Sequence, residues 1–368
     1  MKTMFKKITL LLISFIFIES AFSEDYKLRK AGMSSERLDR LYEEFKQDTD
    51  QNKIPGFVAM IMRKGQLAQF KAYGYADIEN KIPLQKDSIF RIYSMTKPVT
   101  GVALMILIEE GKLSLDDPVK KYIPAFGQTK VYKKMVDNEV VTESLIRDIT
   151  IRDLATHTSG LSYAINDPDP VSNLYRERKI FPYYYPNQEG GFDGAKSYED
   201  ICAFSSSVAE IPLKHQPGTQ WTYSIGMDIL GCVVEVISGL TFENYLQKYI
   251  FDPLNMTSTG FSVDSSEKKS FTTLYTSGAF SRDGEIVGPK GLNPRDLMFS
   301  KELRSIDLFD KSPYLSQSKL FDGGSGLVSN IDDYSKFSEM LLNDGELNGV
   351  RILSKASVDL MSRNHLGI

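Results

Sequence analysis

Residues 94–108 read SMTKPVTGVALMILI, which places a serine and a lysine three positions apart at the start of a strongly apolar run. This spacing puts the side chains of Ser94 and Lys97 on one face of a helix, one turn apart. A serine hydroxyl is a weak nucleophile until a nearby base takes its proton, and a desolvated lysine amine can be that base. Because the rest of the run is apolar nearly all round, we expect a buried helix with Ser94 at its positive end.

The spacing alone is weak evidence, because three other Ser-x-x-Lys pairs occur in the chain. All three lie in polar, loop-like sequence without an apolar helix behind them: Ser265/Lys268, Ser266/Lys269 and Ser316/Lys319. The apolar context therefore selects Ser94 as the candidate nucleophile.

A second segment supports this selection. Residues 216–224 read QPGTQWTYS and precede an apolar run at 226–239, so we expect a turn, a short aromatic loop and a helix, in that order. At this point the sequence resembles the serine β-lactamase-like family, which comprises class C β-lactamases, DD-peptidases and esterases of the same fold. In that family Ser-x-x-Lys is the first catalytic box, and a tyrosine in a Tyr-Ser-x or Tyr-x-Asn box is the second. The resemblance assigns the second box to Tyr223.

The resemblance covers about residues 30 to 368. Residues 149–161, ITIRDLATHTSGL, are similar to the family's segment between the first two boxes, and residues 323–329, GGSGLVS, are similar to its later glycine-rich turn. Ile225 occupies the Asn position of the Tyr-x-Asn form. This departure favours the esterase-like branch over the strict β-lactamase pattern.

The resemblance implies acyl transfer through a covalent ester on Ser94. Lys97 and Tyr223 would share general acid–base duty, and the backbone N–H of Ser94 would be one oxyanion donor. The implied partner is a small-molecule acyl substrate, a carboxylic ester or a related compound. Two alternatives stay open: a non-catalytic binding protein or inactive truncated homologue, and a β-lactamase or DD-peptidase. We expect His157 to be a hydrogen-bonded structural residue.

Family members also carry a third box after the glycine-rich turn, usually Lys-Thr-Gly, His-Thr-Gly or Trp-Gly-Gly. None of these tripeptides is present in the sequence. We therefore expect either an incomplete chain or a protein that has lost an oxyanion donor and part of its sheet, and the sequence does not distinguish the two.

The first residues have the features of a signal peptide. A basic start with Lys2, Lys6 and Lys7 precedes an apolar core at 8–18 and small residues around Ser23. The core is shorter than a transmembrane helix, so we expect cleavage, no stable membrane span afterwards, and a periplasmic or secreted protein. An uncleaved interfacial anchor is the alternative.

Composition limits the other classes. The chain of 368 residues has a formal net charge of −4 and no basic run, which argues against a nucleic-acid partner. Its three histidines lack metal-ligand spacing, so we expect neither a metal nor a cofactor. No Gly-x-Ser-x-Gly pentapeptide is present, which excludes the α/β-hydrolase arrangement. Cys202 and Cys232 lie in apolar surroundings, and we expect buried free thiols. The oligomeric state is left open.

The expected fold is α+β: an antiparallel sheet flanked by helices, with a large α-rich region and a sheet incomplete at the C-terminus. After a signal peptide at 1–23, one hydrolase domain would span 24–368. Its α/β part would comprise about 24–93 and the C-terminal segment, and its α-rich part about 94–318.

Local signals predict several elements. A helix begins at Ser34 or Ser35, and strands at 56–64 and 66–78 flank a Lys64-Gly65 turn. Residues 271–289 read as a hairpin around 283–284. An irregular insertion at 162–200 is either a lid whose aromatics line an acyl pocket or a surface segment with its own small cluster.

Overall fold

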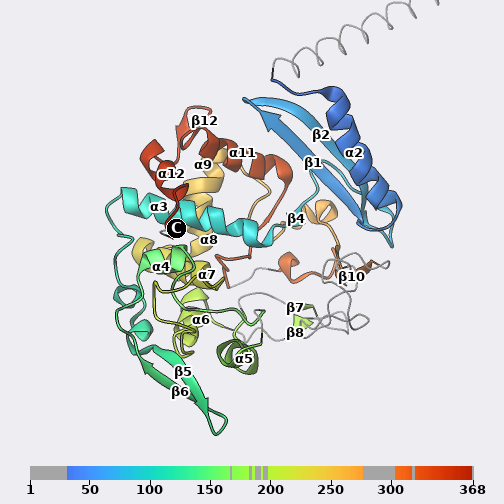
Figure 1. Ribbon diagram of the computed structural model, residues 1–368. Coiled ribbons are helices and arrows are strands. Elements are labelled where there is room, and N and C mark those ends of the chain that lie inside the picture. The colour runs from blue at the N-terminus through green and yellow to red at the C-terminus, as the bar shows by residue number, and fades with distance from the viewer. Residues whose placement is uncertain are drawn as a thin grey trace, which may run out of the picture.

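The computed structural model describes residues 31–165, 168–181, 185–186, 192–193, 198–276, 303–316 and 320–366. The predicted signal peptide at 1–23 and the predicted turn at 283–284 lie outside these residues. In the described part, helices and antiparallel strands combine as an α+β fold, as the sequence predicts (Figure 1).

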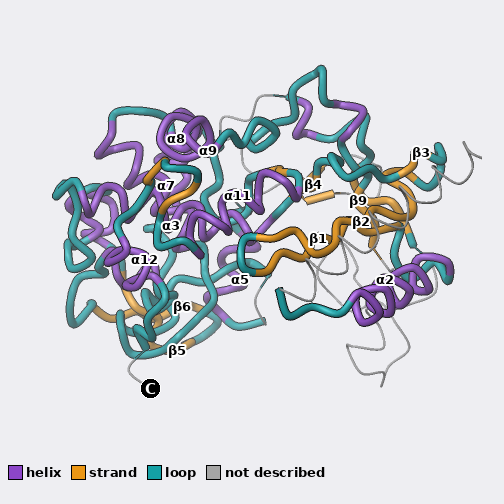
Figure 2. Tube along the Cα trace, turned by 90° about the horizontal axis from the view of Figure 1, so that it is seen from above, coloured by secondary structure: helices purple, strands orange, loops and turns teal. Residues whose placement is uncertain are grey.

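An antiparallel sheet covered by one helix forms the N-terminal part. Helix α2 (Ser35–Asp50) begins after Ser34, whose hydroxyl accepts the Arg37 N–H. Strands β1 (Gly56–Arg63) and β2 (Gln66–Asp77) pair around the predicted turn, and β3 (Ile82–Pro83) pairs with β2. Helix α2 packs on this sheet through aromatic contacts such as Tyr42 with Phe57 (Figures 1 and 2).

Two short strands connect this sheet region to the candidate nucleophile. Strand β4 (Phe90–Arg91) pairs with β11 (Val328–Ser329), far away in the sequence. A 3₁₀ turn at Tyr93–Met95 follows β4, and helix α3 (Thr96–Glu109) follows the turn. Ser94 therefore lies on the 3₁₀ turn, and the α-helix begins two residues later than the sequence suggested. Such turns are frequent at helix N-termini.

Helix α3 lies in the centre of the α-rich region, and nine of its fourteen residues are buried. It packs against α7 (Gly226–Ser238), the second apolar helix that the sequence predicted. The other helices around this pair are α4 (Ile151–Ala155), α6 (Ile201–Val208), α8 (Phe242–Leu246), α9 (Asp252–Leu254), α11 (Ile331–Leu342) and α12 (Lys355–Met361). Figure 1 shows α3 crossing this region with α7, α8 and α12 beside it. The expectation of a buried helix after Ser94 is confirmed.

The α-rich region contains a hairpin that the sequence analysis did not predict. Strands β5 (Lys130–Val136) and β6 (Glu139–Ser144) pair around Asp137 and Asn138, both of which have positive φ. Asp and Asn tolerate this left-handed conformation and favour two-residue hairpin turns. The signal was present in the sequence.

The insertion at 162–200 is not irregular throughout. Helix α5 (Pro170–Glu177) lies within it, capped by Asp169, whose carboxylate accepts two backbone N–H groups. Val171 and Tyr175 are buried in the main hydrophobic core. The prediction of a separate small cluster is therefore wrong for this part of the segment. The aromatic residues at 182–184 lie outside the described residues.

The prediction of two free thiols is also wrong. Cys202 on α6 and Cys232 on α7 form a disulfide, with their Cα atoms 4.9 Å apart. The surroundings of both cysteines are apolar, as expected. The two helices pack directly against each other and bring the sulfur atoms together. The apolar sequence context predicts that the two cysteines are buried. Their pairing follows only from the packing of the two helices.

The remaining strand pairs are short. Strand β9 (Leu274–Thr276) pairs with β10 (Arg304–Asp307), which lies beyond the hairpin predicted over 271–289. The other pairs are β7 (Tyr185–Pro186) with β8 (Phe192–Asp193) and β12 (Glu346–Leu347) with β13 (Val350–Arg351).

None of the described helices alone has the length and apolar composition needed to cross a bilayer. The bent pair Gly226–Ser238 and Phe242–Leu254 meets both criteria when the two helices are taken together.

Candidate active site

The three residues predicted to carry the chemistry lie together. The Ser94 Oγ is 2.7 Å from the Tyr223 Oη and 3.0 Å from the Lys97 Nζ, which donates to it. The side chain of Ser94 is exposed, so an incoming molecule can reach the hydroxyl. A hydroxyl with an amine and a phenol at hydrogen-bond distance has the geometry of an activated nucleophile.

Local structure explains how Ser94 is presented. Tyr93, directly before it, has a backbone φ of +42°, a conformation that residues other than glycine adopt uncommonly. The chain thus turns sharply between β4 and α3, and Ser94 stands at the turn with the buried helix behind it. The N-cap position of α3 is occupied by Met95, whose side chain makes no capping hydrogen bond. Ser94 is therefore not simply an N-cap residue.

Lys97 is held from three sides. Its Nζ donates to the Gly324 carbonyl at 2.8 Å as well as to Ser94, and lies 4.9 Å from the ring centroid of Tyr223. The ring of Tyr163 lies 5.8 Å away on another side. Because the aromatic rings and the carbonyl all favour a cation or a donor at this position, the amine has a defined place beside Ser94.

The glycine-rich turn at 323–326 can approach Lys97 because Gly323 and Gly324 lack side chains. A Cβ on Gly324 would lie 2.7 Å from a carboxylate oxygen of Asp228, and one on Gly323 would lie 2.5 Å from the Met227 carbonyl. The Thr100 hydroxyl donates to the Gly323 carbonyl at 2.6 Å, which ties the turn to α3. The turn therefore packs against α3 and α7 together.

His157 supports the loop that carries Tyr223. The Ser224 N–H donates to the His157 Nδ1 at 3.3 Å, and the imidazole ring lies 5.0 Å from the Tyr223 ring. Burial, aided by the positive charge of Lys97, lowers the pKa of His157 to about 4. The ring is neutral near pH 7 and accepts at Nδ1, which agrees with the expected structural role.

Three residues at the site were not singled out from the sequence: Tyr163, Asp228 and Asp322. Tyr163 is buried and its hydroxyl donates to Asp228 at 3.3 Å. Asp228 is fully buried on α7, five residues after Tyr223, and Asp322 precedes the glycine-rich turn. An aspartate inside an apolar helix is an unusual residue, and it was the signal that could have identified Asp228.

Ile225 is fully buried at the start of α7, so no amide side chain reaches the site from this position.

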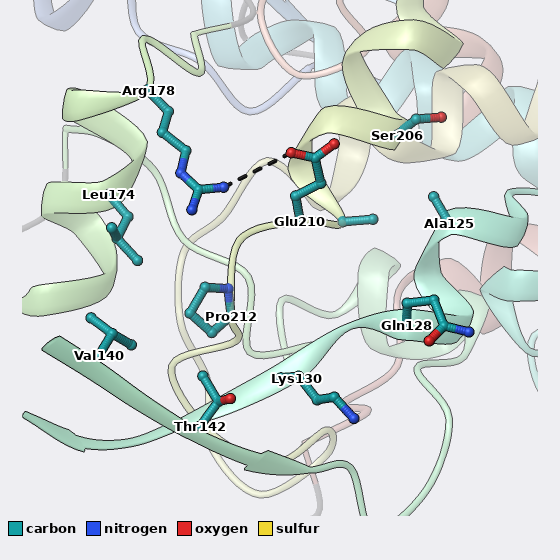
Figure 3. Close-up of a pocket in the computed structure, with 11 residues that line it drawn as sticks. Ala125, Gln128, Lys130, Val140, Thr142, Leu174, Arg178, Ser206, Glu210 and Pro212 are labelled. Atoms are coloured by element: carbon teal, nitrogen blue, oxygen red, sulfur yellow. Dashed lines mark ion pairs between the residues drawn. The ribbon is translucent and has the colours of Figure 1, made fainter.

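An apolar groove of about 600 Å³ lies between β1 and α11, and Met95, the neighbour of Ser94, lines it. A second cavity, of about 530 Å³, lies in the α-rich region, where Arg178 and Glu210 form an ion pair of 3.9 Å (Figure 3). None of the three predicted catalytic residues lines this second cavity. No cluster of three or more histidine, cysteine, aspartate or glutamate side chains in the described residues could hold a metal ion.

Comparison with known proteins places this geometry in context. The family model described as Beta-lactamase matches residues 38–367. The chain is 33% identical to protein Rv1367c of Mycobacterium tuberculosis over 318 residues, covering 86% of this chain and 69% of the relative. It is 29% identical to esterase EstB of Burkholderia gladioli over 328 residues, covering 88% of this chain and 72% of that esterase.

The fold is also similar to that of a solved hydrolase structure. The structure of EstCE1, a hydrolase with promiscuous acyltransferase activity, superimposes with a TM-score of 0.65 and 26% identity, covering 88% of this chain and 76% of that one. Esterase and acyltransferase relatives support a serine-hydrolase type of enzyme. The chain belongs to the Beta-lactamase family.

Proposed function

We propose that the protein is an exported serine hydrolase that cleaves carboxylic esters through a covalent acyl-enzyme on Ser94. The observation that carries the proposal is the contact set of the Ser94 Oγ, which lies 2.7 Å from Tyr223 and 3.0 Å from Lys97. The esterase relatives support the ester as the substrate class.

The first half-reaction forms the acyl-enzyme. As the Ser94 Oγ attacks the ester carbonyl carbon, its proton moves to the Tyr223 oxygen, which enters the step as a phenolate beside the Lys97 ammonium. The Lys97 amine, in contact with both Oγ and the tyrosine ring, stabilises the negative charge that passes between the two oxygens. Collapse of the tetrahedral intermediate breaks the bond to the leaving alcohol, which takes the proton back from Tyr223. The backbone N–H of Ser94 is the proposed oxyanion donor.

The second half-reaction releases the acid. Water attacks the acyl carbon, gives its proton to Tyr223, and the proton returns to the Ser94 Oγ as the acyl–oxygen bond breaks. Each half-reaction moves one proton onto the Tyr223 oxygen and then off it again. Lys97 and Tyr223 therefore end each half-reaction in their starting protonation states. Because Ser94 is exposed and Lys97 is half-buried, water and substrate reach the hydroxyl while the amine stays shielded.

The test is to locate the acyl group. A fluorophosphonate probe followed by peptide mapping is expected to label Ser94, and Ser94→Ala is expected to remove both labelling and the burst with p-nitrophenyl butyrate. Lys97→Met and Tyr223→Phe should each lower kcat by about 10²–10⁴-fold, as the loss of a general acid–base group does.

A matched control tests whether the Ser-x-x-Lys spacing alone is sufficient for activity. Ser266→Ala changes a serine with the same spacing to a lysine but in an exposed turn, and it should leave labelling and turnover unchanged. An adduct on another serine, with Ser94→Ala still active, would contradict the proposal. Ligand binding without turnover in the unsubstituted protein would instead support a non-catalytic binding protein.

Substrate preference is expected to favour short acyl esters over β-lactams. Ile225 supplies no amide that could pair with the polar groups of a β-lactam, and an unpaired buried partner costs about 1–3 kcal/mol. We expect p-nitrophenyl butyrate to give a kcat/KM at least about tenfold above that of nitrocefin. The opposite order would favour the β-lactamase alternative.

Export rests on the predicted signal peptide at 1–23, and the disulfide between Cys202 and Cys232 supports it, because disulfides persist in oxidising compartments. N-terminal sequencing of the protein recovered from the periplasm or medium tests the cleavage near Ser23. Recovery of the uncleaved chain in the membrane fraction would favour the interfacial anchor.

A further inference from the structure

Two buried carboxyl groups lie directly behind the lysine of the site. Asp228 is fully buried and Asp322 is 2% exposed, and their side chains hydrogen-bond to each other. Both accept the same backbone N–H, that of Gly324, at 3.0 and 2.6 Å. Two ionised carboxylates that accept the same N–H, without a cation between them, would repel each other strongly. A single proton shared by the two carboxyl groups is therefore the stable arrangement.

The donors around the pair show which carboxyl holds the charge. Asp322 accepts from the Gly324 N–H, the Ser325 N–H at 2.9 Å and the Ser325 hydroxyl at 2.5 Å. Asp228 accepts from the Gly324 N–H and from the Tyr163 hydroxyl at 3.3 Å. Since more and shorter hydrogen bonds reach Asp322, it is the carboxylate of the pair and Asp228 is the acid.

The electrostatic surroundings agree with this assignment. Burial, together with repulsion from Asp322, raises the pKa of Asp228 well above its ordinary value, while the charge of Lys97 acts in the opposite direction. The titratable groups that face Asp228 are Asp322, which precedes the glycine-rich turn, Lys97 from α3 and Tyr163 from the loop after α4.

One peptide group connects the pair to the lysine. In the peptide unit between Gly324 and Ser325, the N–H donates to Asp322 at 2.9 Å and the C=O accepts from the Lys97 Nζ at 2.8 Å. A carboxylate on the N–H polarises the peptide and makes its carbonyl a stronger acceptor. The charge of the pair therefore acts on Lys97 through two hydrogen bonds, and Lys97 in turn contacts the Ser94 Oγ.

We propose that Asp228 and Asp322 form a carboxyl pair that holds one proton at neutral pH and positions Lys97 through the Gly324–Ser325 peptide. Both are positioning residues, because neither touches the nucleophile. Loss of the shared proton would place two negative charges behind Lys97, break the contact between the carboxyls and displace the turn. The inference rests on the proposed function for its kinetic arm only.

The substitution Asp228→Asn tests the proton directly. An asparagine at this position can accept the Gly324 N–H with its oxygen and donate its NH₂ to Asp322, so it imitates the protonated acid and cannot ionise. We expect Asp228→Asn to fold and, relative to its own kcat at neutral pH, to retain activity at alkaline pH where the unsubstituted enzyme declines. Asp228→Ala is expected to lower kcat about 10²-fold with little change in KM, because it frees the turn that holds Lys97.

Asp333→Asn is the matched control. Asp333 is equally buried and accepts the Ser258 N–H at 2.7 Å, but it lies on α11 and makes no contact with the Lys97 network. This variant is expected to lose stability without changing the pH profile of kcat. A pH profile of Asp228→Asn that superimposes on that of the unsubstituted enzyme would overturn the proposal.

A spectroscopic arm needs no turnover. Infrared spectra at neutral pH should contain a protonated carboxyl C=O band that disappears in Asp228→Asn and persists in Asp333→Asn. Absence of this band from the unsubstituted protein would overturn the shared proton. A band without any esterase activity would instead contradict the proposed function and leave the pair established.

Discussion

The imidazole of His157 links two parts of the site at the scale of a single residue. It accepts the N–H of Ser224 and lies against the Tyr223 ring, and its backbone has φ +57°. Its pKa in the folded protein is about 4, whereas the ordinary value is about 6.5. Between these values the unfolded chain binds the proton and the folded chain does not, so folding stability falls as the pH falls through this window.

We therefore predict that the free energy of unfolding depends on His157 in acid. Between pH of about 7 and about 4.5 the unsubstituted protein should lose about 2–3 kcal/mol more than His157→Asn. Asparagine suits this test because it tolerates the left-handed backbone and its side-chain oxygen can accept the Ser224 N–H. Urea unfolding at both pH values measures the difference, and the neutral-pH value is the internal control. Equal losses in the two proteins would contradict the prediction.

The sequence predicts individual site residues when their chemistry is local. Ser94 and Lys97 lie three positions apart beside an apolar run, so their pairing could be predicted from the residues themselves. Tyr223 was assigned to the site by its resemblance to the family's second box. Asp322 could not be predicted, because its role depends on the approach of the glycine-rich turn to Lys97. The carbonyl of Gly324 carries no side-chain signal at all.

At the scale of elements, the disulfide is the feature that most changes the energetics. It joins α6 to α7 across a separation of 30 residues, and α7 also carries Asp228. Closing a loop of this length in the unfolded chain is worth about 3–4 kcal/mol in the chain-entropy model.

Removal of the disulfide is predicted to lower stability and leave the chemistry intact. Cys202→Ser/Cys232→Ser should lose about 3–4 kcal/mol of unfolding free energy while kcat at a permissive temperature stays nearly unchanged. Urea unfolding and p-nitrophenyl butyrate hydrolysis measure the two effects. The unsubstituted protein under reducing conditions should behave in the same way, and a loss of kcat that precedes unfolding would show that the disulfide holds the site itself.

Elements were predictable where short-range signals agree. Helix α2 has a capping serine and an amphipathic pattern, and β1 and β2 flank a turn with two positive-φ residues. The β5–β6 hairpin and α5 have comparable local signals, Asn138 and the Asp169-Pro170 start, so both were also predictable from the sequence. The pairings of β4 with β11 and β9 with β10 join distant segments, and no local pattern predicts them.

At the scale of the whole molecule, a buried ion pair joins the strand before the nucleophile to a segment more than 200 positions later. The Arg91 Nε donates to Asp307 at 2.5 Å, and the same guanidinium donates to the Thr272 carbonyl at 2.6 Å and to Ser312 at 3.1 Å. Both side chains of the pair are 3% exposed or less. Such a pair is costly to break because one charge is then left buried and alone.

Breaking this pair should therefore destabilise the fold as a whole. Arg91→Met is predicted to lower the free energy of unfolding by about 3–5 kcal/mol, and the double variant Arg91→Met/Asp307→Leu should recover part of the loss. Arg351→Met is the control, because its ion pair with Glu346 is exposed and worth less than about 1 kcal/mol. Urea unfolding of the unsubstituted protein and the three variants measures these differences. Equal effects of Arg91→Met and Arg351→Met would contradict the prediction.

The contacts of Ser94 also have a consequence for how activity appears during folding. The serine meets Tyr223 across 129 positions of the chain, and Lys97 meets the Gly324 carbonyl across 227. Contacts between such distant positions close late, because the intervening chain must be ordered first, whereas helices form from nearby residues within microseconds. Upon dilution from denaturant, helical circular dichroism should return before hydrolysis does, and the lag between the two signals would report the time at which the distant segments dock.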